Sequence, residues 1–258
     1  MRILITGASS GIGRALAEHY ARRGDSVGAL ARRADVLADL ARQFPSLTPL
    51  PADITDPDAM SRAVHDFASK VGGLDLLYAN AGIGQQSPDE AWDLAKARTL
   101  TSINILGTLN TITPALTLMM AQRAGHIVGI SSLAGVTPMP ASAVYGSSKA
   151  WLAFYLRSLE MDLAQSHHLR FTLVLPGHVS TAMVDGSSVG LVTDSARRAA
   201  ERIASGVAAG KRTIAFPRKV ALLARLSAFI PHTTRARMQN RRLARRKSQR
   251  TSKGLGHT

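Results

Sequence analysis

The sequence has no cysteine, few aromatic residues and no acidic residue after Glu201. Without cysteine, the chain can form no disulfide and no thiolate metal site, and it has no cysteine nucleophile. Disulfides are optional even outside the cytosol, so this absence leaves the redox compartment open. No metal site is predicted.

The basic charge is concentrated at one end of the chain. The 258 residues carry 32 Lys and Arg against 17 Asp and Glu. Residues 1–210 hold 18 basic and 17 acidic residues, whereas residues 211–258 hold 14 basic residues and no acidic one. An acid-free end of this kind is typical of a solvated tail that attracts polyanions or anionic lipid. With 45% hydrophobic residues, the chain can bury one sizeable core.

The chain alternates between strand and helix patterns. Apolar, β-branched runs predict six buried strands, and three- and four-residue apolar spacing predicts the helices between them. This alternation predicts an α/β fold, a Rossmann-type doubly wound parallel sheet with helices on both faces, in a single domain. The predicted strands are 2–6, 26–31, 74–80, 126–131, 171–175 and 213–216, and the predicted helices are 14–23, 56–71, 90–123, 147–165 and 195–209.

The first strand enters a glycine turn directly, which leaves no room for a charged and apolar signal segment. We therefore expect a cytoplasmic protein. The turn reads TGASSGIG, with Gly7, Gly11 and Gly13 before a helix. Glycine permits positive φ and a close backbone approach, and the helix start offers free N–H groups to a pyrophosphate. The turn predicts dinucleotide binding by Gly7, Ser9, Ser10, Gly11, Ile12 and Gly13.

The end of the second strand carries Arg32 and Arg33 where an acidic residue would bind the ribose of NAD. A guanidinium can pair with a 2′-phosphate, so both arginines favour NADP(H). Asp53-Ile54 and Asn80-Ala81-Gly82 are placed at further carboxyl ends of strands, where Rossmann ligands bind. These residues are predicted to line the adenosine site.

Three residues indicate proton-transfer chemistry. Ser132 follows the predicted strand 126–131, and Tyr145 and Lys149 are four residues apart. On a helix that spacing places the ammonium beside the phenol, where it can favour the ionised phenolate. A phenol with a pKa near 10 needs such help to exchange a proton at neutral pH. Ser131 is interpreted as a bystander.

Together, these motifs resemble the short-chain dehydrogenase/reductase family over residues 1–217. TGASSGIG is similar to its coenzyme motif and Asn80-Ala81-Gly82 to its fourth-strand motif, and Asn104 in SINILG is similar to its active-site asparagine. ISSLAG with YGSSK is similar to its serine and Tyr-x-x-x-Lys elements, and PGHVST at 176–181 to its Pro-Gly motif. The departure is Ser10, where many NADP(H)-dependent relatives carry a basic residue.

The resemblance implies an NADP(H)-dependent interconversion of an alcohol and a ketone or aldehyde. Tyr145 would be the acid/base, Ser132 would hydrogen-bond the reacting oxygen, and Lys149 would lower the pKa of Tyr145 and hold the nicotinamide ribose. Asn104 would hold a water linked to Lys149. The resemblance also implies cofactor contacts and a homodimer or homotetramer; the contacts would come from Pro176, Gly177, Val179 and Thr181.

Two other functions stay open. The same fold could serve a noncatalytic NADP(H)-sensing regulator, because fold alone does not fix function. The chain could also be a lipid-type carbonyl reductase at a membrane surface. An epimerase or dehydratase is disfavoured by the Gly7, Gly11 and Gly13 spacing and by the short chain.

Two segments bear on substrate and partner. The loop 182–200 closes over substrate in relatives and is mostly apolar here, which favours a small, uncharged carbonyl or alcohol compound. We divide the chain into a catalytic domain at 1–218 and an end at 219–258 that comprises an apolar helix and a basic, disordered tail. That helix is too short to span a bilayer and could cap the pocket, contact a subunit, lie on an anionic membrane or bind a partner. Nucleic acid is not expected, because no aromatic stacking platform accompanies the charge.

Overall fold

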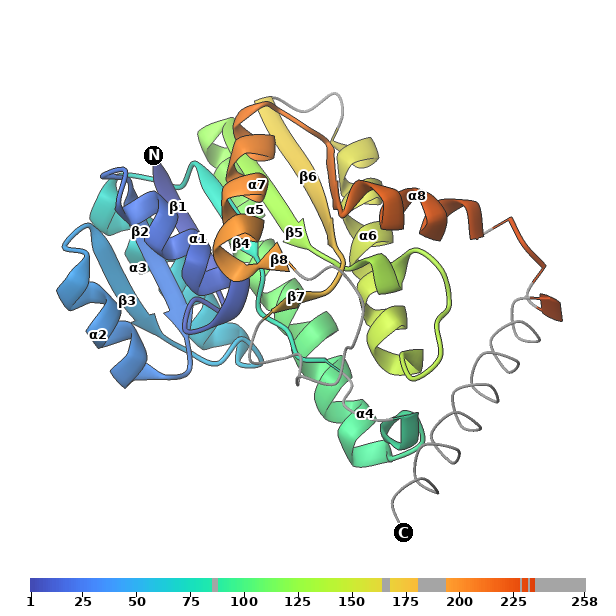
Figure 1. The fold of residues 1–258 in the computed structure, drawn as a ribbon. Coiled ribbons are helices and arrows are strands. Elements are labelled where there is room, and N and C mark those ends of the chain that lie inside the picture. The colour runs from blue at the N-terminus through green and yellow to red at the C-terminus, as the bar shows by residue number, and fades with distance from the viewer. Residues whose placement is uncertain (85–87, 164–167, 181–193, 228, 232, 235–258) are drawn as a thin grey trace, which may run out of the picture.

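The fold is built on a parallel sheet of seven strands in the described part of the chain, in the order β3-β2-β1-β4-β5-β6-β9 (Figure 1). The computed structural model describes residues 1–84, 88–163, 168–180, 194–227, 229–231 and 233–234. The sheet strands are β1 (Arg2–Thr6), β2 (Ser26–Ala31), β3 (Leu47–Pro51), β4 (Leu76–Ala79), β5 (Ala124–Ile130), β6 (His168–Pro176) and β9 (Thr213–Phe216), and a separate short pair joins β7 (Val179–Ser180) to β8 (Asp194–Ser195).

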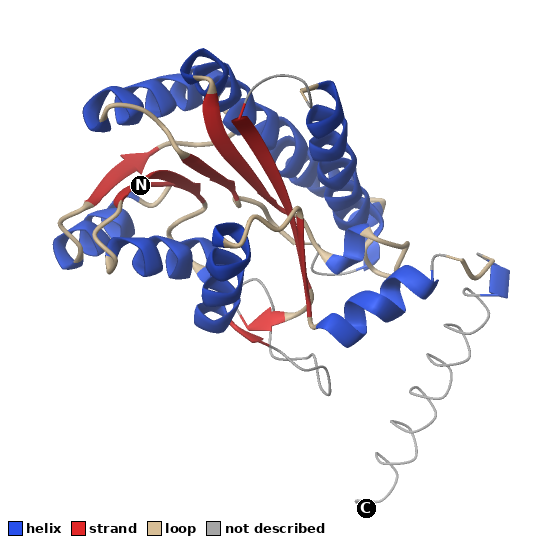
Figure 2. Ribbon diagram, turned by 90° about the horizontal axis from the view of Figure 1, so that it is seen from above, coloured by secondary structure: helices blue, strands red, loops and turns tan. Residues whose placement is uncertain are grey.

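Helices cover both faces of the sheet, as the view from above shows (Figure 2). One layer contains α1 (Gly11–Ala21), α2 (Ala34–Gln43) and α7 (Ala196–Ala208), and the other contains α3 (Pro57–Val71), α5 (Gly107–Gln122) and α6 (Ala143–Asp162). The other helices are α4 (Leu94–Thr101), α8 (Arg218–Ser227), the π-helix η2 (Ser102–Leu106) and the 3₁₀ turns η1 (Pro88–Ala91) and η3 (Leu133–Gly135). The predicted fold class is confirmed.

Two hydrophobic clusters explain why the strands read as continuous apolar runs. In β1, Ile3 and Ile5 pack into the cluster beneath α1 and α7, while Leu4 packs into the cluster beneath α3 and α5. Successive side chains of a strand point to opposite faces, and both faces of this sheet are covered. A strand buried on both faces therefore needs apolar residues at every position.

The prediction of six strands was one too few. All six lie in the sheet, but β3 (Leu47–Pro51), which precedes Asp53, was not among them. Its sequence contains Pro49 and Pro51, which cannot donate a hydrogen bond to a neighbouring strand. β3 is an edge strand that pairs only with β2 in the described sheet, and an edge position tolerates proline.

Two helix predictions also need correction. Helix α2 was missed, although its buried Leu37 and Leu40 have helical spacing. The predicted helix 90–123 is divided into α4, η2 and α5, because the chain widens to a π-helix around Asn104. The described stretch Leu94–Gln122 is long and apolar enough to cross a membrane by length and composition alone. However, Ile112, Ala115 and Met119 of α5 are buried in the core, which accounts for much of that apolar character.

The strand order reverses direction between β1 and β4. From β1 the chain proceeds through β2 to β3 on one side, and from β4 through β5 and β6 to β9 on the other. Crossover connections on either side of such a switch point leave a crevice at the carboxyl ends of the strands. This is where the fold places its ligand site.

A buried pair of tyrosines ties α1 to the sheet. The hydroxyls of Tyr20 in α1 and Tyr78 in β4 are 2.6 Å apart, and both residues are almost completely buried. Each hydroxyl is the other's hydrogen-bond partner in an otherwise apolar cluster. The pair therefore fixes α1 against β4 near the centre of the fold.

We expect Tyr78→Phe and Tyr20→Phe each to lower the free energy of unfolding by about 1–3 kcal/mol, because each leaves one buried hydroxyl unpaired. The double variant should lose clearly less than the sum of the two, since no polar group is then stranded. Urea unfolding of the four proteins measures this coupling. Simple additivity would show that the hydroxyls do not depend on each other.

Candidate active site

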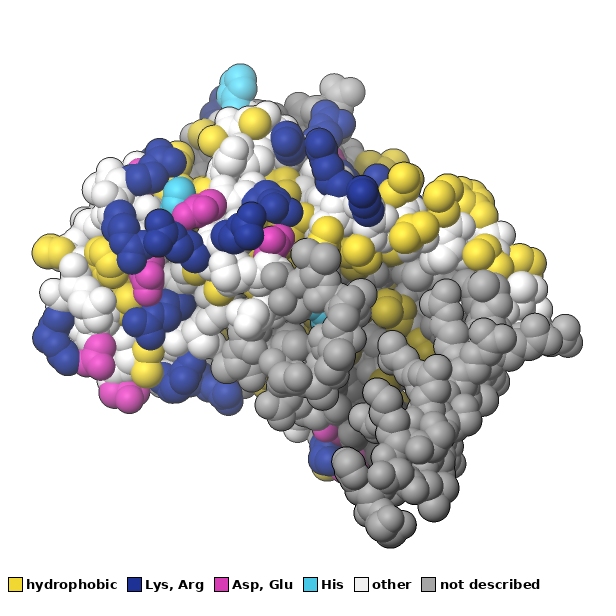
Figure 3. Space-filling view, viewed as in Figure 1, with side chains coloured by type: hydrophobic (Ala, Val, Ile, Leu, Met, Phe, Trp, Pro, Cys, Tyr) yellow, Lys and Arg dark blue, Asp and Glu magenta, His cyan; other side chains and the backbone are white. Residues whose placement is uncertain are grey.

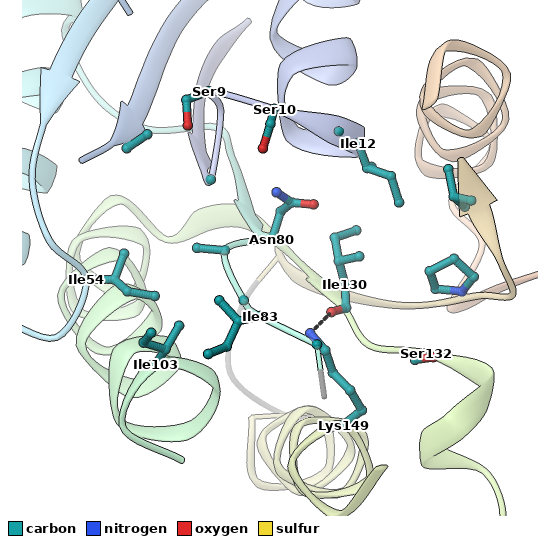
Figure 4. A pocket seen from close by; sticks show the side chains of 18 of the residues that line it. Ser9, Ser10, Ile12, Ile54, Asn80, Ile83, Ile103, Ile130, Ser132 and Lys149 are labelled. Atoms are coloured by element: carbon teal, nitrogen blue, oxygen red, sulfur yellow. Dashed lines mark hydrogen bonds between the residues drawn. The ribbon is translucent and has the colours of Figure 1, made fainter. Parts of the chain in front are cut away.

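A cavity of about 480 Å³ lies at the carboxyl ends of the strands, and it brings together nearly all the predicted site residues (Figure 4). Of the predicted residues, Asn104 and Gly13 do not line the cavity, and Thr181 lies outside the described residues, as does most of the loop 182–200. The predicted residues that line it are Gly7, Ser9, Ser10, Gly11, Ile12, Arg32, Arg33, Asp53, Ile54, Asn80, Ala81, Gly82, Ser132, Tyr145, Lys149, Pro176, Gly177 and Val179.

The glycine turn forms one end of the cavity and needs its glycines for close packing. Gly7 has φ +70°, and a Cβ there would lie 2.9 Å from the Ala81 Cα. A Cβ on Gly13 would lie 2.4 Å from the Gly7 carbonyl oxygen. Helix α1 begins at Gly11, and the Ser10 side chain makes no capping hydrogen bond to it. The turn and the helix start therefore present backbone N–H groups to the cavity, which suits a pyrophosphate.

Thr6 and Asn80 hold the glycine turn against the end of β4. The Thr6 hydroxyl oxygen accepts hydrogen bonds from the backbone N–H groups of Asn80 and Ala81, both at 3.1 Å. In return, the Asn80 side-chain amide donates to the Thr6 carbonyl at 2.8 Å. Two strand ends that are far apart in the sequence thus form one rigid edge of the site.

The arginines lie at the outer rim of the cavity. Arg33 donates from Nη2 to the backbone oxygen of Ser9 at 3.1 Å and to its hydroxyl at 3.0 Å. Arg32 Nη1 is 3.8 Å from an Asp53 carboxylate oxygen, and the Arg32 side chain is two-thirds exposed. The Thr55 backbone hydrogen bond is the main cause that lowers the pKa of Asp53, with Arg32 contributing less. Two cations thus flank the end of β2.

Ser132 and Tyr145 meet at the other end of the cavity. Ser132 follows β5, and its hydroxyl oxygen accepts a hydrogen bond from the Ala134 backbone N–H at 3.1 Å. Tyr145, in the first turn of α6, is hydrogen-bonded to the Ser132 side chain. Burial raises the pKa of Tyr145, and the Ser132 hydrogen bond offsets part of that rise.

Lys149 lies one helical turn beyond Tyr145 and is buried. Its Nζ donates to the Ile130 carbonyl oxygen at 2.9 Å, as the dashed line in Figure 4 shows. Burial lowers its pKa from 10.5 to about 8. That Lys149 lowers the pKa of Tyr145 stays a prediction. The ammonium is bound to Ile130, and the burial of the phenol dominates its pKa.

Asn104 stands behind the cavity wall, in the π-helix. Its Oδ1 accepts from the Ile83 N–H at 2.8 Å, and its Nδ2 donates to the Ile83 carbonyl and to the Ser148 hydroxyl, both at 3.0 Å. The side chain is thus occupied by protein partners, and it joins the segment after β4 to α6. A π-helix often marks a functional position because its extra residue redirects a side chain.

Sequence reasoning missed two serines that position α6. The Ser131 hydroxyl donates to the Lys149 carbonyl at 2.7 Å, so Ser131 is no bystander. The Ser148 hydroxyl donates to the Tyr145 carbonyl at 2.7 Å and accepts from Asn104. The sequence signal that could have identified them is that Ser131 directly precedes Ser132 and Ser148 directly precedes Lys149. The Ser131 contact depends on how β5 meets α6, and the contact between Ser148 and Asn104 depends on how η2 meets α6.

These features define a Rossmann-type dinucleotide site joined to a Ser-Tyr-Lys group, the arrangement of a nicotinamide-dependent oxidoreductase. The family model described as short chain dehydrogenase matches residues 1–191. An uncharacterised oxidoreductase of Myxococcus xanthus is 32% identical over 234 residues, which cover 89% of this chain and 92% of that protein. The chain belongs to the short chain dehydrogenase family.

Two further relatives extend the comparison. The 11-beta-hydroxysteroid dehydrogenase 1A of Arabidopsis thaliana is 35% identical over 190 residues, which cover 71% of this chain and 54% of that protein. A short chain dehydrogenase from Burkholderia cenocepacia, solved in complex with NADP, superposes with a TM-score of 0.77 at 27% identity. That superposition covers 91% of this chain and 95% of the other.

We expect Lys149→Met to stabilise the protein near pH 7 by about 1–3 kcal/mol, because a buried ammonium is replaced by an apolar side chain. The unfolded chain holds the Lys149 proton up to about pH 10.5, whereas the folded chain releases it from about pH 8. Wild-type stability should therefore rise between these values, and the gain from Lys149→Met should shrink to near zero by about pH 10.

Urea unfolding from about pH 7 to about pH 10 measures this effect. The matched control is Lys70→Met on α3, where the lysine is exposed and bonded to the Thr48 hydroxyl. That change should alter stability little at any pH. A loss of stability in Lys149→Met near pH 7 would contradict the argument.

Proposed function

We propose that this protein is an NADP(H)-dependent oxidoreductase that interconverts an alcohol and a ketone or aldehyde, with Tyr145 as the acid/base. One observation carries the proposal: Ser132, Tyr145 and Lys149 line the same cavity as the glycine turn, with Ser132 hydrogen-bonded to Tyr145. A hydroxyl pair of this kind can hold a substrate oxygen and exchange a proton with it.

The residues divide the chemistry between them. When bound, the nicotinamide supplies or accepts the hydride. Tyr145 gives a proton to the carbonyl oxygen during reduction, or takes it from the alcohol during oxidation. The Ser132 hydroxyl, held by the Ala134 N–H, hydrogen-bonds the same oxygen. Lys149 would hold the nicotinamide ribose and supply positive charge as the phenolate forms.

Asn104 acts in this scheme mainly by position. The Asn104 Oδ1 accepts from the Ile83 N–H and the Asn104 backbone carbonyl accepts from the Thr108 hydroxyl, so each oxygen keeps one lone pair for the water expected to link Asn104 to Lys149. Through Ser148, the side-chain contacts of Asn104 reach the Tyr145 carbonyl. Asn104 therefore fixes the start of α6, and with it the direction of the phenol.

The choice of NADP(H) over NAD(H) rests on the two rim arginines. Neither residue at the end of β2 is acidic, so no carboxylate there repels a 2′-phosphate. Arg32 is largely exposed and only loosely paired with Asp53, so it can turn to an incoming phosphate. Arg33 is already directed at the glycine turn through Ser9. Both line the cavity.

A small, uncharged substrate suits the apolar residues that line the described cavity. Ile83, Ile103 and Ile130 line the cavity, with Ile130 beside Lys149 and Ile103 beside Ile54 (Figure 4). The expected substrate loop 182–200 is apolar in sequence but falls mostly outside the described residues. The name of the Arabidopsis relative, a hydroxysteroid dehydrogenase, is in keeping with a lipophilic alcohol or ketone.

A homodimer or homotetramer would account for a group of exposed apolar side chains on the body of the protein. They gather on the segment from η1 to α5 and on α6, and a subunit contact there would remove them from water. The most exposed are Trp92, Leu94, Leu106, Phe154 and Met161.

We expect Arg32→Ala and Arg33→Ala together to weaken NADPH binding by about ten- to a hundredfold, because charge-assisted hydrogen bonds contribute about 1.5–3 kcal/mol. NADH binding should change little, since it has no 2′-phosphate. Titration by cofactor fluorescence measures both affinities. Arg42→Ala is the matched control, an exposed α2 arginine paired with Asp39. Equal losses for NADPH and NADH would refute 2′-phosphate recognition.

We expect Tyr145→Phe to reduce turnover of carbonyl compounds by about a hundredfold or more, because it deletes the proton donor and keeps the ring. NADPH binding should be retained. Oxidation of NADPH with a panel of aldehydes and ketones measures the rate, and Tyr155→Phe on the same helix is the control. Tight NADPH binding by the wild type without turnover on any compound would instead favour a cofactor-sensing regulator.

A further inference from the structure

Helix α8 carries its apolar side chains on the face that points away from the protein. It begins at Arg218, and its buried residue is Ala221, which packs into the cluster of α5 and α6. Leu222, Leu223 and Leu226 are more than half exposed, and Phe229, one turn further along, is 86% exposed. At about 100° per residue, Leu222 and Leu226 lie about 40° apart around the helix and about 100–140° from Ala221, and Leu223 lies about 160° from it. Phe229 lies beyond the end of α8 at Ser227.

This apolar face does not serve the cavity. Among the described residues, none of α8 lines it, so the interpretation of this helix as a pocket cap finds no support there. In the space-filling view, hydrophobic side chains are gathered on the part of the surface that carries α8 (Figure 3). Leucine and phenylalanine exposed to this degree along one helix face mark an interaction surface.

The charged residues of α8 are all basic. Arg218, Lys219 and Arg225 lie on α8 itself. Residues 211–258 contain 14 basic residues and no acidic one, so the sequence beyond α8 adds no negative charge. The partner must therefore accept apolar side chains and carry negative charge at the same place. A bilayer with anionic headgroups meets both requirements, because its boundary is apolar on one side and charged on the other.

Other occupants fit less well. A nucleic acid would neutralise the arginines but would leave Leu222, Leu226 and Phe229 in water. A second copy of this chain would bring the same positive charge to the contact, which opposes association. The ten residues of α8 make a helix of about 15 Å, too short to span about 30 Å of hydrocarbon, so the helix would lie in the surface.

We propose that α8 and Phe229 form a docking surface for membranes with anionic headgroups, with Leu222, Leu226 and Phe229 entering the lipid boundary and the basic residues pairing with headgroup phosphates. The surface is close to the active site. Helix α8 begins one residue after Pro217, whose neighbour Phe216 accepts a hydrogen bond from the Gly177 N–H at 2.7 Å. Gly177 lines the cavity. Docking would thus bring the Gly177 side of the cavity near the lipid.

Vesicle flotation of the full-length protein tests the proposal. We expect strong binding to phosphatidylcholine vesicles that contain one-third phosphatidylglycerol, about tenfold weaker binding to pure phosphatidylcholine, and loss of binding in high salt. The triple variant Leu222→Gln, Leu226→Gln and Phe229→Gln keeps every charge and should lose about tenfold or more in partitioning. The matched control is Met139→Gln, which replaces an exposed apolar side chain outside both α8 and the proposed subunit contact.

Three results would overturn the proposal. The wild type could fail to bind anionic vesicles, or the triple variant could bind as well as the wild type, which would assign binding to charge alone. Light scattering could show instead that the triple variant breaks an oligomer while neither protein binds vesicles. NADPH titration verifies that the variants are folded. Leu226→Trp offers a second readout, because its emission should shift to the blue on anionic vesicles if this face enters lipid.

Discussion

The hydrogen bonds between Thr6 and the Asn80-Ala81 backbone determine where every other part of the site can lie. They join the end of β1 to the end of β4, the two strands between which the sheet reverses its order. The glycine turn can then approach β4 so closely that Gly7 and Gly13 have no room for a Cβ. Three residues after Asn80 in the chain, Ile83 is hydrogen-bonded to the Asn104 side chain. Asn104 in turn donates to the Ser148 hydroxyl, and Ser148 donates to the Tyr145 carbonyl. The cofactor end and the chemical end of the cavity are therefore connected by hydrogen bonds.

Lys149 shows the cost of this arrangement to stability. The fold buries an ammonium with the Ile130 carbonyl as its partner, and burial pulls its pKa down to about 8. An apolar residue would suit the position better if folding alone mattered. Strained or desolvated groups of this kind are kept where they serve a ligand, because stability and function compete at active sites. A cofactor hydroxyl near Lys149 would give the ammonium the polar partner that the protein alone supplies only in part.

The sequence was sufficient for the fold class and for most cavity residues, and the reasons are local. The glycine turn lies between a strand and a helix, and Tyr145 and Lys149 are one helical turn apart. The function of each motif can therefore be inferred from residues close to it in the sequence. What could not be predicted depends on contacts between distant segments. β3 was missed because its two prolines are tolerated only at the edge of a sheet, and edge position is a property of the assembled sheet. The role of Ser131 follows from how β5 meets α6, the role of Ser148 follows from how η2 meets α6, and the raised pKa of Tyr145 follows from burial.

Helix α8 illustrates a different limit of sequence reasoning. Its apolar residues and its arginines are evident in the sequence, but the same pattern fits a buried cap, a subunit contact and a surface helix. The difference lies in which face packs on the body of the protein. The small residue Ala221 is buried while the leucines face outward, so α8 gains little apolar burial by packing on the described part of the chain. A helix kept in this orientation beside the Gly177 side of the cavity gains little apolar burial from the described part of the chain, and its basic residues favour an anionic, apolar surface as its partner.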